Sequence, residues 1–175
     1  GATNWSFLRA GEVYPGYPKY RELQYGHADG NQWVAAECDV SIRPGWFYHP
    51  EEDNRVKTVD QLTDLYYRSV GHNGTLLLNF PVDRNGLIHP TDSLNAVTFH
   101  QRVQKELADN LLSKAKVSAS DERGGQFNIR ALTDGQYDTY WATNDSVMAA
   151  DLTFTFEQPT KMNRVMIQEY IPLGQ

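Results

Sequence analysis

Residues 37–49 concentrate side chains that could bind a polar, ring-shaped ligand. Glu37 and Asp39 are two positions apart, so on a strand their carboxylates would share one face. Carboxylates and a guanidinium can hydrogen-bond to ligand hydroxyls, while aromatic rings pack on apolar edges. The candidate substrate-binding set is Trp46, Glu37, Asp39, Arg43, Tyr48 and His49. The alternative is that the strand divides its residues between core and solvent and the aromatic rings serve packing. The spacing leaves both interpretations open.

A strand, a helix and a second strand are expected to position this set. Residues 34–42 alternate apolar and polar side chains, which predicts a strand that ends at Arg43-Pro44-Gly45. Thr58 and Gln61 have the spacing of a capping box, so a helix is expected from Val59 to Gly71 or Gly74. The continuous apolar run over 75–80 then predicts a strand buried on both faces, as in a parallel sheet.

A second helix is expected from about Thr91 to Leu112, with Thr91 or Asp92 as its cap. Strand, helix, buried strand and helix form the pattern of a right-handed parallel unit, and two such units suit the closing part of a (β/α)8-like barrel. The core-facing stripe predicted for this helix is Leu94, Val97, Phe99, Val103, Leu107 and Leu111.

The remainder of the chain has the pattern of a β-sandwich. Residues 113–126 are small and polar, as in a domain joint, and strands are expected over 129–132, 150–156 and 162–169. The predicted fold class is therefore α/β plus β. A C-terminal part of a (β/α)8-like domain over 1–112 precedes the start of an antiparallel β-sandwich over 127–175, truncated at its end. The opening residues, 1–32, read as irregular loop.

Composition narrows the possible functions. The 175 residues are 40% hydrophobic and 22% charged, with a net charge of −6, which suits a globular protein and disfavours nucleic-acid binding. No apolar run approaches the ~20 residues of a membrane span. Cys38 is the single cysteine and no Cys and His cluster occurs, so no metal site is expected. The chain begins without Met and ends within a predicted strand, so both ends are expected to be internal to a longer protein.

Four phrases in succession resemble glycoside hydrolase family 29, whose members are α-L-fucosidases. They are WVAAECDVSIRPGWFYH, LYYRSVGHNGTLLLNFPVDRNGLIHPTD, ALTDGQYDTYWAT and NRVMIQEYIPLGQ. The closer resemblance is to the subgroup that acts on α-1,3- and α-1,4-linked fucose. It implies a catalytic barrel followed by a β-sandwich of discoidin-like or jelly-roll type. It also implies a retaining mechanism that needs no cofactor, in which one carboxylate attacks the anomeric carbon and another acts as acid and base.

The resemblance also assigns expected roles. The family's nucleophile lies in a Trp-x-Asp-Gly-like motif and the subgroup's acid/base in a Gly-Asn-Glu phrase, and neither occurs here, so the chain by itself is expected to be inactive. Glu37 stays an alternative acid/base, because it lies near a strand end. More favoured is that Glu37 and Asp39 are fixed charges that orient Arg43 or a sugar hydroxyl. Trp46 would pack on the apolar face of fucose.

The expected partners are a fucosylated oligosaccharide or glycoconjugate and the rest of the protein's own catalytic domain. This substrate class implies a secreted or periplasmic protein. The alternative function is a lectin-like β-sandwich without catalysis, since the phrase from Asp134 to Trp141 resembles discoidin-like carbohydrate-binding modules. In such modules the Asp and Thr of this phrase hold a turn and the tryptophan packs in the core.

Overall fold

The computed structural model describes residues 7–12, 14, 18–19, 22 and 26–170. The chain forms two compact units, Gly1–Leu107 and Ala108–Gln175. The opening segment was expected to be irregular, and part of it lies outside the described residues. Within the described part, β1 (Phe7–Leu8) pairs antiparallel with β2 (Gln32–Trp33).

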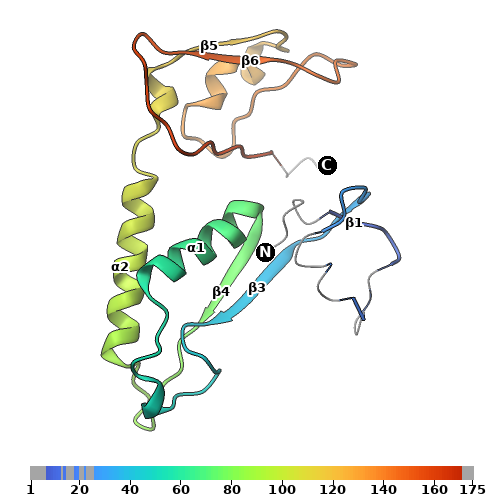
Figure 1. The fold of residues 1–175 in the computed structure, drawn as a ribbon. Coiled ribbons are helices and arrows are strands. Elements are labelled where there is room, and N and C mark those ends of the chain that lie inside the picture. The colour runs from blue at the N-terminus through green and yellow to red at the C-terminus, as the bar shows by residue number, and fades with distance from the viewer. Residues whose placement is uncertain (1–6, 13, 15–17, 20–21, 23–25, 171–175) are drawn as a thin grey trace. The chain divides into compact units, whose positions relative to one another are not determined.

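The predicted parallel unit is present in the first unit (Figure 1). Strand β3 (Ala36–Ser41) pairs in parallel with β4 (Gly74–Asn79), and α1 (Val59–Ser69) connects them. Glu37 lies opposite Thr75 and Ser41 opposite Asn79. The strand predicted over 34–42 began two residues too early and ended one too late, because β3 and its parallel ladder run from Ala36 to Ser41.

The two faces of this sheet differ in exposure. Along β3, Ala36, Cys38 and Val40 are half-buried, while Glu37 and Asp39 are exposed. Ile42 continues the less exposed face and is fully buried, as is Leu62 of α1. The prediction that the second strand is buried on both faces is wrong in this structure, because Leu77 is 51% exposed on the face shared with Glu37 and Asp39. An apolar run cannot tell whether a further layer covers the second face.

Helix α1 begins as predicted. Thr58 Oγ1 accepts from the Gln61 amide, and the Gln61 side chain accepts from the Thr58 amide, which completes the capping box. After Ser69 a 3₁₀ turn over Val70–His72 leads to Asn73, which has a left-handed backbone with φ of 60°. The helix end predicted at a glycine is thus made by Asn73, since asparagine tolerates this conformation.

The second helix, α2, spans Pro90–Glu106 and is shorter than predicted. His89, not Thr91 or Asp92, caps it by accepting from the Thr91 amide. Leu111 belongs to a separate 3₁₀ turn over Leu111–Lys114. The predicted apolar stripe is partly wrong. Leu94, Val97 and Leu107 are exposed, whereas Asp92 and Val103 are buried. A charged residue occupies the inner face because it pairs with a buried arginine.

The described part of the second unit, residues 108–170, holds one small sheet, in which β5 (Lys116–Ala119) pairs antiparallel with β6 (Leu152–Thr155). Strand β6 confirms part of the strand predicted over 150–156. The strand predicted over 129–132 is wrong, because Ile129–Leu132 is a 3₁₀ turn capped by Asn128. The strand predicted over 162–169 is also absent from these described residues, and β5 lies within the segment predicted as a joint. A 3₁₀ turn also covers Gly125–Phe127.

Candidate functional site

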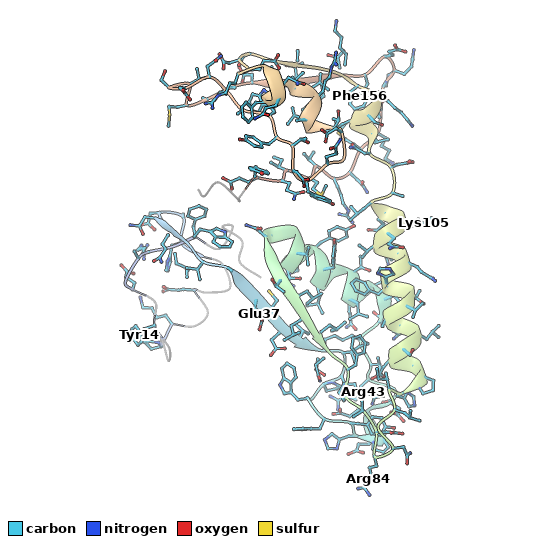
Figure 2. The ribbon with its side chains drawn as sticks, turned by 180° about the vertical axis from the view of Figure 1, so that it is seen from behind. Tyr14, Glu37, Arg43, Arg84, Lys105 and Phe156 are labelled. Carbon is cyan, nitrogen blue, oxygen red and sulfur yellow. The ribbon has the colours of Figure 1, made fainter. Side chains whose placement is uncertain are left out.

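The candidate site lies where β3 and β4 end (Figure 2). In parallel α/β folds the chemistry is placed at the carboxyl ends of the strands, on the loops that follow them. Here those loops are residues 42–58, which include a 3₁₀ turn over Pro50–Glu52, and residues 80–89. Arg43 follows the carboxyl end of β3, whereas Glu37 is the second residue of the strand. The expectation that Glu37 lies near the end that carries the chemistry is therefore wrong, because Glu37 lies at the amino end of β3.

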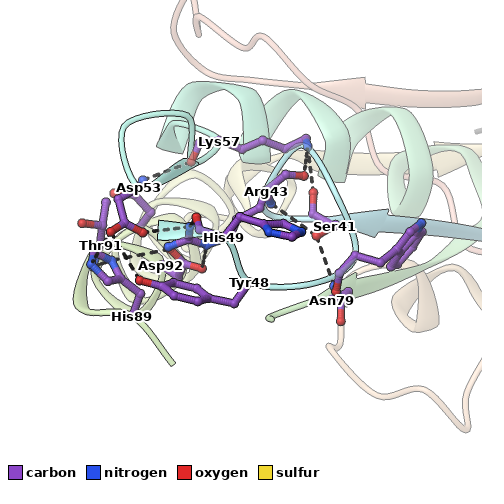
Figure 3. A network of polar contacts seen from close by, with 12 residues as sticks. Ser41, Arg43, Tyr48, His49, Asp53, Lys57, Asn79, His89, Thr91 and Asp92 are labelled. Atoms are coloured by element: carbon purple, nitrogen blue, oxygen red, sulfur yellow. Dashed lines mark hydrogen bonds and ion pairs between the residues drawn. The ribbon is translucent and has the colours of Figure 1, made fainter. Parts of the chain in front are cut away.

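Arg43 forms the buried centre of this region (Figure 3). Its Nε and Nη2 donate to the two carboxylate oxygens of Asp92 at 2.7 and 2.9 Å, and neither side chain has any exposed surface. Nη1 lies 2.9 Å from Asp53 Oδ1 and donates to the His49 carbonyl at 3.4 Å. The hydrogen bonds that Arg43 donates to Asp92 raise the pKa of Arg43, so the guanidinium stays charged. With its donors occupied, Arg43 supports the loop and is withdrawn from solvent.

Tyr48 packs on this ion-pair cluster. The Arg43 guanidinium lies 4.6 Å from the Tyr48 ring centroid, and the Tyr48 hydroxyl donates to Asp53 Oδ2 at 3.3 Å. Burial and the neighbouring Asp53 carboxylate raise the pKa of Tyr48. The ring also stacks on His89, the cap of α2, with centroids 6.2 Å apart. Tyr48 is therefore turned toward the protein interior.

Trp46 and Phe47 project from the turn between Arg43 and Tyr48. They are 50% and 78% exposed, so a large part of each residue is accessible to a ligand. The Trp46 carbonyl accepts a hydrogen bond from Asn79 Nδ2 at 3.1 Å. The His49 side chain is also exposed, with Nδ1 3.8 Å from Glu51.

Glu37 and Asp39 lie on the exposed face of β3. The expectation that they orient Arg43 is wrong, since Arg43 pairs with Asp92 and Asp53. The structure thus divides the predicted substrate-binding residues into two groups. Arg43 and Tyr48 face inward, whereas the side chains of Trp46, His49, Glu37 and Asp39 are open to solvent.

Several residues of the network were not predicted from the sequence. Lys57 Nζ donates to the carbonyls of Ser41 and Arg43 at 2.7 and 3.4 Å, and so joins the two ends of the loop. Asp92 lies 49 positions from Arg43, and no local pattern links them. The only available signal for Asp92 was its position in the first turn of a helix, which suits any acidic residue. The residues missed in this way are Asp53, Lys57, His89 and Asp92.

The second unit contains the predicted Asp-Gly turn. Asp134 accepts from the Thr139 hydroxyl at 2.7 Å and from the Gln136 amide at 2.8 Å, and the Thr139 bond lowers the pKa of Asp134. Trp141 is half-buried and its indole nitrogen is enclosed. These contacts confirm the turn and favour packing for Trp141.

In the described part of the chain, no group of three or more His, Cys, Asp or Glu side chains could hold a metal ion. Among the same residues, no helix combines the length and apolarity needed to cross a membrane.

Comparison with known proteins gives a consistent result, although no family model matches the chain. An Arabidopsis thaliana protein named alpha-L-fucosidase 1 is 37% identical over 183 residues, covering the whole chain. A solved Ruminococcus gnavus GH29 fucosidase in complex with fucose is 30% identical, covers 87% of this chain and has a TM-score of 0.70. A solved Bacteroides thetaiotaomicron structure, assigned as an α-L-fucosidase, is 44% identical over 90% of the chain, with a TM-score of 0.80.

The chain spans about a third of each of these relatives, namely 35%, 31% and 34% of their lengths. Within that third the agreement extends over both units, in sequence and in fold. The chain belongs to glycoside hydrolase family 29.

Proposed function

We propose that the protein carrying this chain is a retaining α-L-fucosidase that removes terminal fucose, in α-1,3 or α-1,4 linkage, from glycans. In this proposal the chain supplies part of the wall of the sugar pocket, while the nucleophile comes from residues outside it. The observation that carries the proposal is the exposed Trp46 ring, held at the carboxyl end of a parallel strand pair in a chain related to fucosidases. The relative solved with fucose supports this substrate class.

The exposed groups suit the chemistry of a deoxy sugar. An indole ring can pack on the methyl group and the C–H face of fucose, where no hydrogen bond is needed. Glu37 and Asp39 can accept hydrogen bonds from sugar hydroxyls on the open face of β3. In a retaining reaction one carboxylate forms a covalent bond to the anomeric carbon. A second carboxylic acid protonates the departing oxygen and then removes a proton from the incoming water. Because these sugars are found on secreted and surface glycans, we also propose an extracytoplasmic location.

Hydrolysis of 4-nitrophenyl α-L-fucoside tests the proposal. The full-length protein should release 4-nitrophenol, and this chain alone should not. Trp46→Ala in the full-length protein should raise KM at least tenfold, while Trp46→Phe keeps an aromatic face and should raise it less. A full-length protein that binds fucosylated glycans without cleaving the fucoside would favour the lectin-like alternative. Activity in the chain alone would make Glu37 the acid/base candidate, to be tested as Glu37→Gln.

A further inference from the structure

Asn79 links the end of the sheet to the turn over residues 44–49, here called the aromatic turn. It is the last residue of β4 and lies opposite Ser41, the last residue of β3. Its Nδ2 donates both to Ser41 Oγ and to the Trp46 carbonyl, each at 3.1 Å. One amide group therefore joins two parallel strands and a turn 33 positions earlier in the chain.

The other end of the same turn is held by the buried ion pair. Arg43 donates to the His49 carbonyl while Asp92 anchors its guanidinium to the start of α2. The turn between residues 44 and 49 is thus held at two carbonyls, that of Trp46 by Asn79 and that of His49 by Arg43. Trp46 carries the first attachment itself and Phe47 lies between the two, and both side chains are exposed. This arrangement fixes the backbone beneath the rings and leaves their faces open.

We propose that Asn79 is a positioning residue for sugar binding, acting through the Trp46 carbonyl. The inference rests on the proposed function of Trp46. Both hydrogens of the Asn79 amide are used within the protein, so its contribution is the place of the indole ring. Binding sites tolerate displacements of only about 0.5 Å before contacts with the ligand are lost. Without Asn79, the Trp46 carbonyl would turn to water and the ring could leave its position.

The Trp46 carbonyl needs a donor, and an ionised aspartate at position 79 could only accept, although the Ser41 hydroxyl could turn to donate to it. Asn79→Asp should therefore lose the hydrogen bond to the Trp46 carbonyl just as Asn79→Ala does, although it keeps the size of the side chain. Asn95 offers a matched control, because its Nδ2 also donates to a loop carbonyl, that of Lys57, at 3.0 Å. Lys57 lies beyond the aromatic turn.

A double-mutant cycle in the full-length protein tests the inference. Loss of two hydrogen bonds, partly replaced by water, should lower kcat/KM for the fucoside about tenfold in Asn79→Ala, mainly through KM. In a Trp46→Ala background the same substitution should change kcat/KM less than about twofold. Asn95→Ala should leave KM unchanged. An equal factor in both backgrounds, or a loss in kcat alone, would overturn the inference.

A spectroscopic measurement separates failure of the inference from failure of the proposed function. In protein labelled with 5-fluorotryptophan, the ¹⁹F signal lost in Trp46→Phe identifies Trp46. That signal should shift or broaden in Asn79→Ala and Asn79→Asp, and stay in place in Asn95→Ala. If the shift occurs in a protein that does not hydrolyse the fucoside, the positioning stands and the proposed function is wrong. If the fucoside is hydrolysed but the signal does not move, the inference is wrong.

Discussion

Replacing Asp92 by Asn tests the central role of the buried ion pair. Asparagine keeps the volume of aspartate but removes its charge and one acceptor, so the buried Arg43 loses its main partner. Breaking a buried ion pair from one side costs about 3–5 kcal/mol. Because Asp53, which is 36% exposed, remains 2.9 Å from Arg43 Nη1, we expect a cost near the lower end, about 3 kcal/mol. At about 2 °C per kcal/mol for a large domain, the unfolding temperature should fall by roughly 6 °C.

Thermal unfolding of the full-length protein measures this change, and two further variants interpret it. The double variant Arg43→Met with Asp92→Leu removes both fully buried charges and should recover a large part of the loss, because Asp53, which loses its guanidinium partner, is partly exposed and keeps its hydrogen bond from Tyr48. Asp60→Asn is the surface control. It removes a carboxylate that pairs with Arg102 but is 85% exposed, so the unfolding temperature should not change measurably. An unchanged temperature in Asp92→Asn would refute the reasoning. A double variant as unstable as Asp92→Asn would show that the shape of the buried side chains, and not their charge, determines the loss of stability.

Two smaller predictions concern a helix cap and a turn. Thr58→Ala removes the acceptor for the Gln61 amide and should lower the free energy of unfolding by about 1 kcal/mol, measured by chemical denaturation. Thr58→Ser keeps a hydroxyl acceptor and should lower it little. Equal losses of stability in the two variants would exclude the cap as the cause. The pKa of Asp83 is lowered by the hydrogen bonds that its carboxylate accepts from the amides of Leu87 and Asn85. The ionised carboxylate therefore stabilises the fold fully above the ordinary aspartate pKa of about 3.9. This stabilisation is lost as the pH falls through the lowered pKa of the folded state. Asp83→Asn should therefore be less stable than the unmutated protein at pH 7, and the difference should shrink below pH 4 in thermal unfolding; a difference that grows on acidification would contradict this.

Local sequence determined the elements of the first unit. The alternation before Arg43, the Thr58 and Gln61 pair and the apolar run before Pro81 were each sufficient to predict β3, α1 and β4, because each signal lies within one element. The parallel pairing followed from their order, since a strand, a helix and a strand in succession pack in parallel. The exposed position of Trp46 was also consistent with its place after a sharp turn.

The second unit was harder to predict for a physical reason. The strand predicted over 129–132 forms a 3₁₀ turn because Asn128 offers a side-chain acceptor to the Arg130 amide. Strand β5 was missed because its alternation covers only four residues, Lys116–Ala119, within a small and polar segment, and its pairing with β6 depends on residues more than thirty positions away. Short strands with weak patterns depend on their partners.

Tertiary structure decided which of the candidate site residues are exposed and so available to a ligand. The sequence placed Arg43 among the sugar-binding residues, but the structure turns it inward because Asp92, which is distant in sequence, supplies a buried carboxylate. The same pairing places a charged residue on the inner face of α2, contrary to the apolar stripe expected from periodicity alone. Likewise, the role inferred for Asn79 depends on a carbonyl brought to it by the fold. Residue types and spacing determine which groups are available, and long-range hydrogen bonds and ion pairs determine which of them stay free to bind.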